Sequence, residues 1–268
     1  MPAGPSNGSL SPFGAQLRYW RGQRGMSQMS LALDAGTTSR HLSFLETGRS
    51  RPSRGMVLRL SDALDIPLRE RNRLLEGAGL SPVYGEQDLR GPDLRPFESA
   101  IERLMQAHEP YPATAVDGHW NVVAANDAAL ALFGADMVGM NVIRHMFGDP
   151  TVQATVANWP DVAWMAIDRL REKVRRAPSD AELTELLALA EAEAANLPRR
   201  ESPPDDLVIC PHFRVGDEII RTVSMIARFD TAVDVTLDEL SIELTYPQDE
   251  AAEGFFRRLA ELRAAAAA

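Results

Sequence analysis

The sequence has 268 residues, of which 45% are hydrophobic and 25% charged, a composition typical of a globular chain long enough for two domains. No apolar run approaches the roughly 20 residues of a membrane-spanning helix, and residues 1–10 lack the layout of a secretion signal, so we expect a cytoplasmic protein. The single cysteine excludes an internal disulfide framework, and the five histidines lack the spacing of metal ligands.

Charge is distributed unevenly along the chain. The formal net charge is −10, yet residues 1–80 contain eleven arginines, no lysine and six acidic residues. The rest of the chain is therefore strongly acidic. A basic N-terminal part joined to an acidic body is typical of a protein in which only one end contacts phosphate groups.

Residues 11–80 predict five short helices, and residues 1–10 predict a disordered tail. The first helix covers residues 13–24, with Phe13, Leu17 and Trp20 on one face. Serine or threonine residues stand where the next three helices need an N-terminal cap, and glycines stand where helices end. The remaining helices are expected over residues 28–35, 39–47, 53–64 and 67–77.

Residues 81–96 predict a linker, because they combine three prolines and two glycines with no helical or strand period. A second domain follows over residues 97–263, opening with a helix at 97–107. A hairpin around Asp117-Gly118 is expected next, with strands at 113–116 and 120–125. Helical segments follow through residue 197, and three strands are expected at 207–215, 219–229 and 239–246. Two strands, a helical excursion and three strands give the order of a PAS-like sensor fold, so we predict an α+β second domain.

The turn Ala35-Gly36-Thr37 predicts a helix-turn-helix, whose second helix protrudes into the major groove of DNA. Arg40 is the best candidate for direct base recognition, because arginine can donate two hydrogen bonds to guanine. Phe44 could contact a thymine methyl group or fill the core, and Gln28 could contact a phosphate. The full set of predicted DNA-binding residues is Gln28, Thr38, Ser39, Arg40, His41, Ser43, Phe44, Arg49, Arg51 and Arg54. The alternative is a plain five-helix bundle with a solvated arginine face.

The segment from Ser27 to Leu80 closely resembles the Cro/repressor-like, or XRE-type, regulators, and its stretch SRHLSFLETGRSRPS at 39–53 is the most specific part. It is similar to the subgroup whose second domain is an MmyB-like ligand-binding domain. The resemblance implies the five-helix fold and assigns DNA contacts to Gln28, Ser39 and Arg40. It continues through YPATAVDGHWNVVAANDAALALFG at 111–134, NVIRHMFGDP at 141–150 and DVTLDELSIELTYP at 234–247.

The family resemblance implies a PAS-like pocket for a small, mainly apolar molecule, with a fatty acid as one possible ligand. Such a pocket needs apolar walls and a few polar anchors. The predicted wall residues are Trp120, Phe133, Phe147, Trp159, Trp164, Phe213 and Met225, although each also suits a core. The predicted anchors are Asn126, His145, His212 and Arg221. Arg221 lies on an apolar strand face, so it needs either a ligand or an acidic residue as its partner.

The sequence Cys210-Pro211-His212 places a thiol near an imidazole, but residues two apart on a strand are not aimed at each other, and no catalytic motif accompanies them. We therefore expect no enzymatic activity and no cofactor. A homodimer is expected, because one recognition helix contacts only half of a two-fold operator. The alternative function is a DNA-binding regulator whose second domain binds a protein partner or mediates dimerisation without a small ligand.

Overall fold

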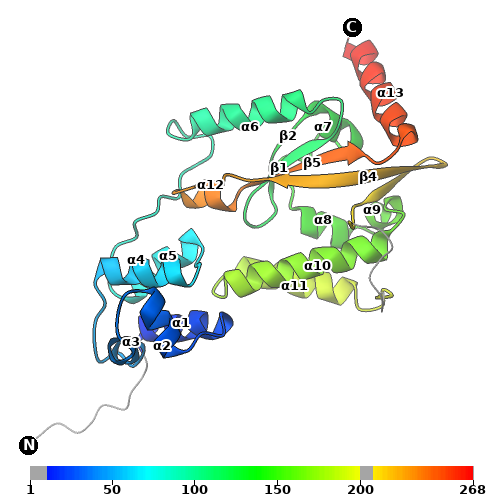
Figure 1. Ribbon diagram of the computed structural model, residues 1–268. Coiled ribbons are helices and arrows are strands. Elements are labelled where there is room, and N and C mark those ends of the chain that lie inside the picture. Colours follow the sequence, from blue (N-terminus) through cyan, green and yellow to red (C-terminus); the bar gives the residue numbers. More distant parts are fainter. Residues whose placement is uncertain (1–10, 200–207, 268) are drawn as a thin grey trace, which may run out of the picture. The chain divides into compact units, whose positions relative to one another are not determined.

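The computed structural model describes residues 11–199 and 208–267 and divides the chain into two compact units (Figure 1). The N-terminal unit comprises Met1–Glu86 with Val233–Val235, and the C-terminal unit comprises Gln87–Ala232 with Thr236–Ala268. The predicted tail at 1–10 lies outside the described residues, as does Leu207, with which the third predicted strand begins.

The N-terminal unit contains the five predicted helices. Their caps follow from local sequence, because Ser11, Ser27, Thr38 and Ser53 each accept a hydrogen bond from a backbone N–H in the first helical turn. The helices are α1 (Pro12–Gln23), α2 (Gln28–Asp34), α3 (Ser39–Glu46), α4 (Arg54–Ala63) and α5 (Leu68–Gly77).

The core of the N-terminal unit is apolar and closely packed. Phe13, Leu17 and Trp20 of α1 are at most 2% exposed, and they share one cluster with buried residues of α2, α3, α4 and α5. Gly14 is required for this packing, because a Cβ atom at that position would lie 2.5 Å from the backbone oxygen of Glu46. Helices α1 and α3 therefore approach each other more closely than a larger side chain would allow.

The C-terminal unit combines a five-stranded antiparallel sheet with helices. The chain makes two strands, passes through a helical segment and returns for three strands, as predicted, and the strand order is β2-β1-β5-β4-β3. The strands are β1 (Ala113–Val116), β2 (Val122–Ala125), β3 (His212–Val215), β4 (Glu218–Ala227) and β5 (Ser241–Pro247). The helices are α6 (Arg95–Ala107), α7 (Asp127–Phe133), α8 (Val142–Gly148), α9 (Pro150–Thr155), α10 (Trp159–Arg176), α11 (Ala181–Glu193), α12 (Val235–Glu239) and α13 (Glu250–Ala267).

Alternation along β5 separates the two faces of the sheet. Ile242 and Leu244 are buried in one cluster with Ile101 and Met105 of α6, so this face is covered by α6. Helices α8, α10 and α11 lie on the other side of the sheet from α6 (Figure 1). These three helices enclose a second apolar cluster, in which Ile167 and Leu186 are fully buried.

Several predicted boundaries were wrong. The third strand begins at His212, since residues 208–211 are irregular, and Glu239 ends α12 instead of opening β5. Trp120 precedes β2 with a φ of 65°, so it belongs to the hairpin turn. The predicted linker is partly ordered against α5, where the side chain of Asn72 accepts the backbone N–H groups of Val83 and Tyr84.

Candidate functional site

The helix-turn-helix is formed by α2, α3 and the turn between them. Gly36 has a φ of 62°, a conformation that favours glycine, and its N–H donates to the carbonyl of Leu33. The hydroxyl of Thr38 then accepts the N–H of His41 at 3.1 Å and caps α3. The sharp turn thus starts α3 in a new direction immediately after α2, as a recognition helix requires.

The outward side of α3 carries the predicted base-contacting residues. Arg40 is exposed, and its guanidinium carbon lies 5.5 Å from the ring centre of Phe44, one turn further along. Ser39, Ser43 and Phe44 are half-buried, as is His41. The Nε2 atom of His41 is buried and has no hydrogen-bond partner among the described residues. Arg40 is therefore the side chain of α3 that is freest to reach a base edge.

A buried carboxylate joins α3 to α1 and α2. Glu46 is 1% exposed, and its oxygens accept from Arg21 Nε at 2.6 Å and from Gln28 Nε2 at 2.8 Å. Arg18 lies 3.6 Å away. Burial disfavours the charged carboxylate, but the hydrogen bonds from Arg21 and Gln28 and the charges of Arg21 and Arg18 outweigh it, so the pKa of Glu46 is lowered.

This arrangement gives Gln28 a structural role that the sequence prediction missed, because its amide nitrogen is engaged inside the unit. If Gln28 contacts a phosphate, it must use the second N–H of its side-chain amide or its backbone N–H at the start of α2. The sequence alone gave no indication that Glu46 is the shared acceptor for side chains of α1 and α2. Its partners lie 18 and 25 residues away in the chain.

Three of the predicted phosphate-binding arginines follow α3. Arg49, Arg51 and Arg54 are exposed, and their guanidinium groups make no hydrogen bond or ion pair with any residue that the structure describes. The loop that carries Arg49 and Arg51 is fixed by the backbone, since the N–H groups of Arg49 and Ser50 both donate to the carbonyl of Phe44, whereas Arg54 is the first residue of α4. Unpaired cations on an ordered loop are available to an external anion.

In the C-terminal unit, four predicted wall residues meet in one cluster. Phe147 and Trp159 are buried, with ring centres 5.2 Å apart, and Trp120 and Trp164 are packed against the same cluster. The other three lie elsewhere. Phe133 and Phe213 form a separate pair 5.3 Å apart, and Met225 is 51% exposed on β4. The seven residues therefore do not line a single pocket.

The predicted polar anchors differ in how far they are engaged. Asn126 is buried and makes four hydrogen bonds, accepting from the N–H groups of Ala113 and Ala129 and donating to the carbonyls of Met105 and Tyr111. It therefore ties α6, β1 and α7 together. The other three anchors are less buried, and among them His212 is half-buried, with its backbone N–H donating to the side chain of Asn158 at 2.9 Å.

Arg221 is more than half exposed and lies 3.9 Å from Asp249. Of the two partners considered for Arg221, the structure therefore shows the acidic residue. His145 is half-buried on α8, near enough for its charge to contribute to the lowered pKa of Asp149, whose main cause is the hydrogen bond from Thr151.

Two family models match the chain. The first is described as a helix-turn-helix domain and covers residues 12–74. The second is described as the MmyB-like transcription regulator ligand binding domain and covers residues 97–259, more than half of the sequence. The chain belongs to the MmyB-like transcription regulators. No curated protein matched it.

This regulator also has a polar contact centre that sequence reasoning did not find. Lys173 of α10 donates to the carbonyl of Gly118 at 2.7 Å, and its ammonium lies 5.4 Å from the ring centre of Trp120. Burial, with the nearby charge of Arg228, lowers the pKa of Lys173 to about 8, while Glu239, Asp117 and Asp180 oppose the shift. The Asp117-Gly118 hairpin signal was visible in the sequence, but its contact with α10 was not.

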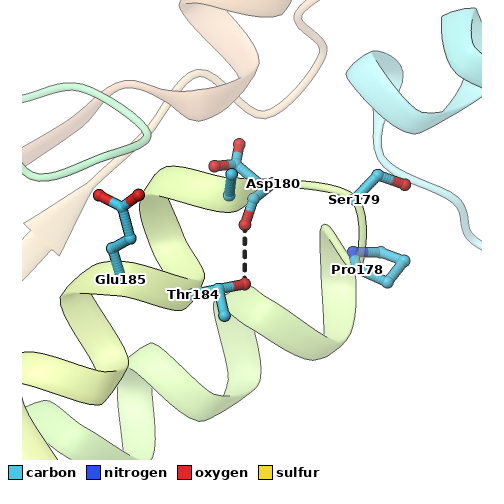
Figure 2. A pocket seen from close by; sticks show the side chains of 6 residues that line it. Pro178, Ser179, Asp180, Thr184 and Glu185 are labelled. Atoms are coloured by element: carbon cyan, nitrogen blue, oxygen red, sulfur yellow. Dashed lines mark hydrogen bonds between the residues drawn. The ribbon is translucent and has the colours of Figure 1, made fainter.

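A hollow of about 330 Å³ opens beside this centre, at the turn between α10 and α11 (Figure 2). It is lined by Pro178, Ser179, Asp180, Ala181, Thr184 and Glu185. The carboxylate of Asp180 is already engaged by His119 at 2.9 Å and caps α11. None of the predicted ligand-binding residues lines this hollow, and its polar groups do not suit an apolar ligand.

No cluster of three or more His, Cys, Asp or Glu side chains suitable for a metal ion occurs in the described part of the regulator. Among its described helices, none combines the length and apolar character that a bilayer crossing requires. The matched families are those of transcription regulators, with a DNA-binding part and a ligand-binding part.

Proposed function

We propose that this protein is a dimeric cytoplasmic regulator whose helix α3 recognises one half of a two-fold operator. The observation that carries this proposal is the exposed Arg40 on α3, followed by the unpaired Arg49 and Arg51 on the adjoining loop and the unpaired Arg54 at the start of α4. Direct base contacts specify sequence, whereas contacts to phosphates set position and affinity. The predicted residues Thr38, Ser39, His41, Ser43 and Phe44 complete this interface in the proposal.

The proposal further assigns small-molecule sensing to the C-terminal unit, with a PAS-like fold as its framework. Support comes from the match to a ligand-binding family model and from the order of two strands, a helical segment and three strands. In this proposal a small and mainly apolar ligand that resembles a fatty acid binds to the C-terminal unit and changes the affinity for the operator. The cluster around Phe147 and Trp159 is the favoured location, because it is apolar and joins four of the predicted wall residues.

The test of DNA recognition begins with selection of bound sequences from random duplex DNA by the full chain. Titrations of the selected duplex over a series of salt concentrations then compare wild type, Arg40→Ala and Arg51→Ala. Arg40→Ala is expected to weaken specific binding by about 1–3 kcal/mol and to relax one base preference. Arg51→Ala should weaken all duplexes alike and reduce the salt slope by about 1.

Arg176→Ala is the matched control, because Arg176 is an exposed arginine of the C-terminal unit and should leave both quantities unchanged. If Arg40→Ala left affinity and base preference intact, α3 would not be the recognition helix. Native mass spectrometry of the intact protein tests dimerisation and ligand retention together, since it reports subunit number and any bound small mass.

The second candidate is a regulator whose C-terminal unit binds a protein partner without a small ligand. It is favoured by apolar side chains that β3 and β4 leave exposed, namely Val215, Ile219, Met225 and Ile226. Two results together would support this alternative. The purified protein would neither retain nor bind a small ligand, and a second protein would bind saturably at these residues.

A further inference from the structure

The outward side of α3 holds a cation against an aromatic ring that lies outside the core. The guanidinium carbon of Arg40 lies 5.5 Å from the ring centre of Phe44, which is four residues further along and so on the same side of the helix. Beyond this contact, Arg40 has no hydrogen bond or ion pair with any residue that the structure describes. Phe44 is half-buried, yet it is not among the described side chains that form the apolar core of the N-terminal unit or pack against it. The ring and the cation therefore form one outward-facing pair.

The backbone that carries this pair is fixed at both ends of α3. At the start, the hydroxyl of Thr38 accepts the N–H of His41. At the end, the carbonyl of Phe44 accepts the N–H of Arg49 at 2.8 Å and the N–H of Ser50 at 3.2 Å. Both side chains thus project from an ordered helix, and the distance between them is set before any DNA is bound.

An arginine–guanine contact places the ring of Phe44 at a defined level of the duplex. Arginine donates two hydrogen bonds to guanine O6 and N7 when its planar guanidinium lies in the plane of the base. Since guanine then occupies the donor edge, a ring in contact with the guanidinium covers one of its faces and points to the next base pair, about 3.4 Å away. A pair two steps away is about 6.8 Å from that plane, which exceeds the 5.5 Å between cation and ring. In the major groove, thymine is the base that presents a methyl group to an apolar side chain.

We propose that Arg40 and Phe44 read two adjacent base pairs as a unit, with Arg40 on a guanine and Phe44 on the methyl group of a thymine in the neighbouring pair. This inference rests on the DNA-recognition part of the proposed function and assigns a two-base-pair element to each operator half-site. Phe44 is then a specificity-determining residue. A ring that only held Arg40 in position would be indifferent to the methyl group, so the two roles are separable by experiment.

The test uses the full chain and the duplex that it selects from random DNA. We expect each selected half-site to contain a guanine whose neighbouring base pair has a thymine. That thymine is then replaced by deoxyuridine, which lacks only the methyl group. Wild type should bind the deoxyuridine duplex about fourfold more weakly, the fold-change that corresponds to about 0.8 kcal/mol for one buried carbon group. Phe44→Ala should bind the two duplexes within about 1.5-fold of each other, because no ring is left to cover the methyl group.

Leu33→Ala is the matched control, because Leu33 is an apolar side chain of α2 in the same unit and is 80% exposed. It should keep the full difference between the two duplexes. Phe44→Leu retains an apolar side chain and should keep a difference of at least about twofold, between those of wild type and Phe44→Ala. Each comparison is a ratio of two affinities for one variant, so a change in the folded fraction of that variant cancels.

The proposal is overturned if wild type binds the thymine and deoxyuridine duplexes equally, because the ring would then not contact the methyl group. A full difference retained by Phe44→Ala would overturn it as well, and so would selected half-sites without a thymine next to the guanine. In each of these cases, sequence-specific binding that depends on Arg40 leaves the proposed function standing. If the full chain selects no sequence at all, recognition by α3 fails together with this inference.

Discussion

The buried carboxylate of Glu46 should determine how firmly α3 is held. Glu46→Gln keeps the size of the side chain but removes the negative charge that Arg21 and Gln28 contact. In the wild type, Arg21 makes two charge-assisted hydrogen bonds to Glu46, at 2.6 and 3.2 Å, and Gln28 makes a third at 2.8 Å. The substituted amide presents an N–H group to one of these donors, so at least one hydrogen bond is lost and the others weaken.

The cost follows from burial. Glu46 is 1% exposed and the side chain of Arg21 is 18% exposed, so Arg21 recovers little hydration when its partner becomes neutral. Removing one partner of a buried ion pair costs about 3–5 kcal/mol, and because Arg21 stays partly hydrated, the expected loss of stability is about 3 kcal/mol. Such a change would lower the melting temperature of a unit of this size by roughly 12–24 °C.

Amide hydrogen exchange of the full chain measures this loss without separating the two units. Exchange in α3 should become roughly a hundredfold faster in Glu46→Gln, which corresponds to about 3 kcal/mol. Glu76→Gln changes an exposed glutamate of the same unit and should leave exchange unaltered. Protection in α3 that matched this control would refute the conclusion that Glu46 holds α3 in place.

The same variant has a defined pH signature. The pKa of Glu46 is lowered in the folded protein, so its contribution is complete above the unfolded pKa of about 4.3 and is lost as pH falls through the folded value. The stability difference between wild type and Glu46→Gln should therefore be constant near neutrality and disappear in strong acid. A difference that grew on acidification would contradict this assignment.

Three further substitutions test the packing and charge of both units. Gly14→Ala should destabilise the N-terminal unit and reduce operator affinity, because the new Cβ would meet the backbone of Glu46 at 2.5 Å; thermal unfolding and DNA titration measure both effects. Asn126→Ala should cost the C-terminal unit about 2–3 kcal/mol in urea unfolding, since it removes four hydrogen bonds to backbone groups and leaves the N–H groups of Ala113 and Ala129 without this acceptor. Lys173→Met should remove a rise in stability between pH 8 and 10, because the folded pKa of about 8 lies below the unfolded value.

Each of these substitutions has a control or an opposing outcome. Gly22→Ala alters a glycine of α1 that has open space around it and should be tolerated, so equal losses for Gly14 and Gly22 would exclude the clash. For Asn126, an unchanged unfolding midpoint would mean that water replaces its amide. For Lys173, only the difference between variant and wild type is compared, because tyrosines also titrate near pH 10, and parallel curves would contradict the low pKa.

The sequence predicted features that depend on neighbouring residues. Ser27, Thr38 and Ser53 cap their helices as expected, because a cap involves only the next three residues. The alternation along β5 likewise predicted its buried face, since Ile242 and Leu244 face α6. These signals are local, so one sequence was sufficient to find them.

Features that depend on distant residues could not be predicted in this way. The three contacts of Glu46 and the contact of Lys173 with Gly118, 55 residues away, arise only when separate helices pack together. Helix α12 has five residues and lies next to an alternating strand, so its period was too short to detect. Predicted wall residues were scattered over several clusters, because an aromatic side chain suits a core and a pocket equally well.

The buried and the exposed sides of α3 have different roles, and this separation affects how the sequence of such a regulator can change during evolution. Leu42, Leu45 and Glu46 hold the helix in place from its buried side, whereas Arg40 projects outward without any role in that packing. If α3 recognises the operator as proposed, substitutions at the outward position change which operator is bound at little cost to folding. Under that proposal, new target genes would be acquired by exchanging a few surface residues, while the helices that present them stay the same.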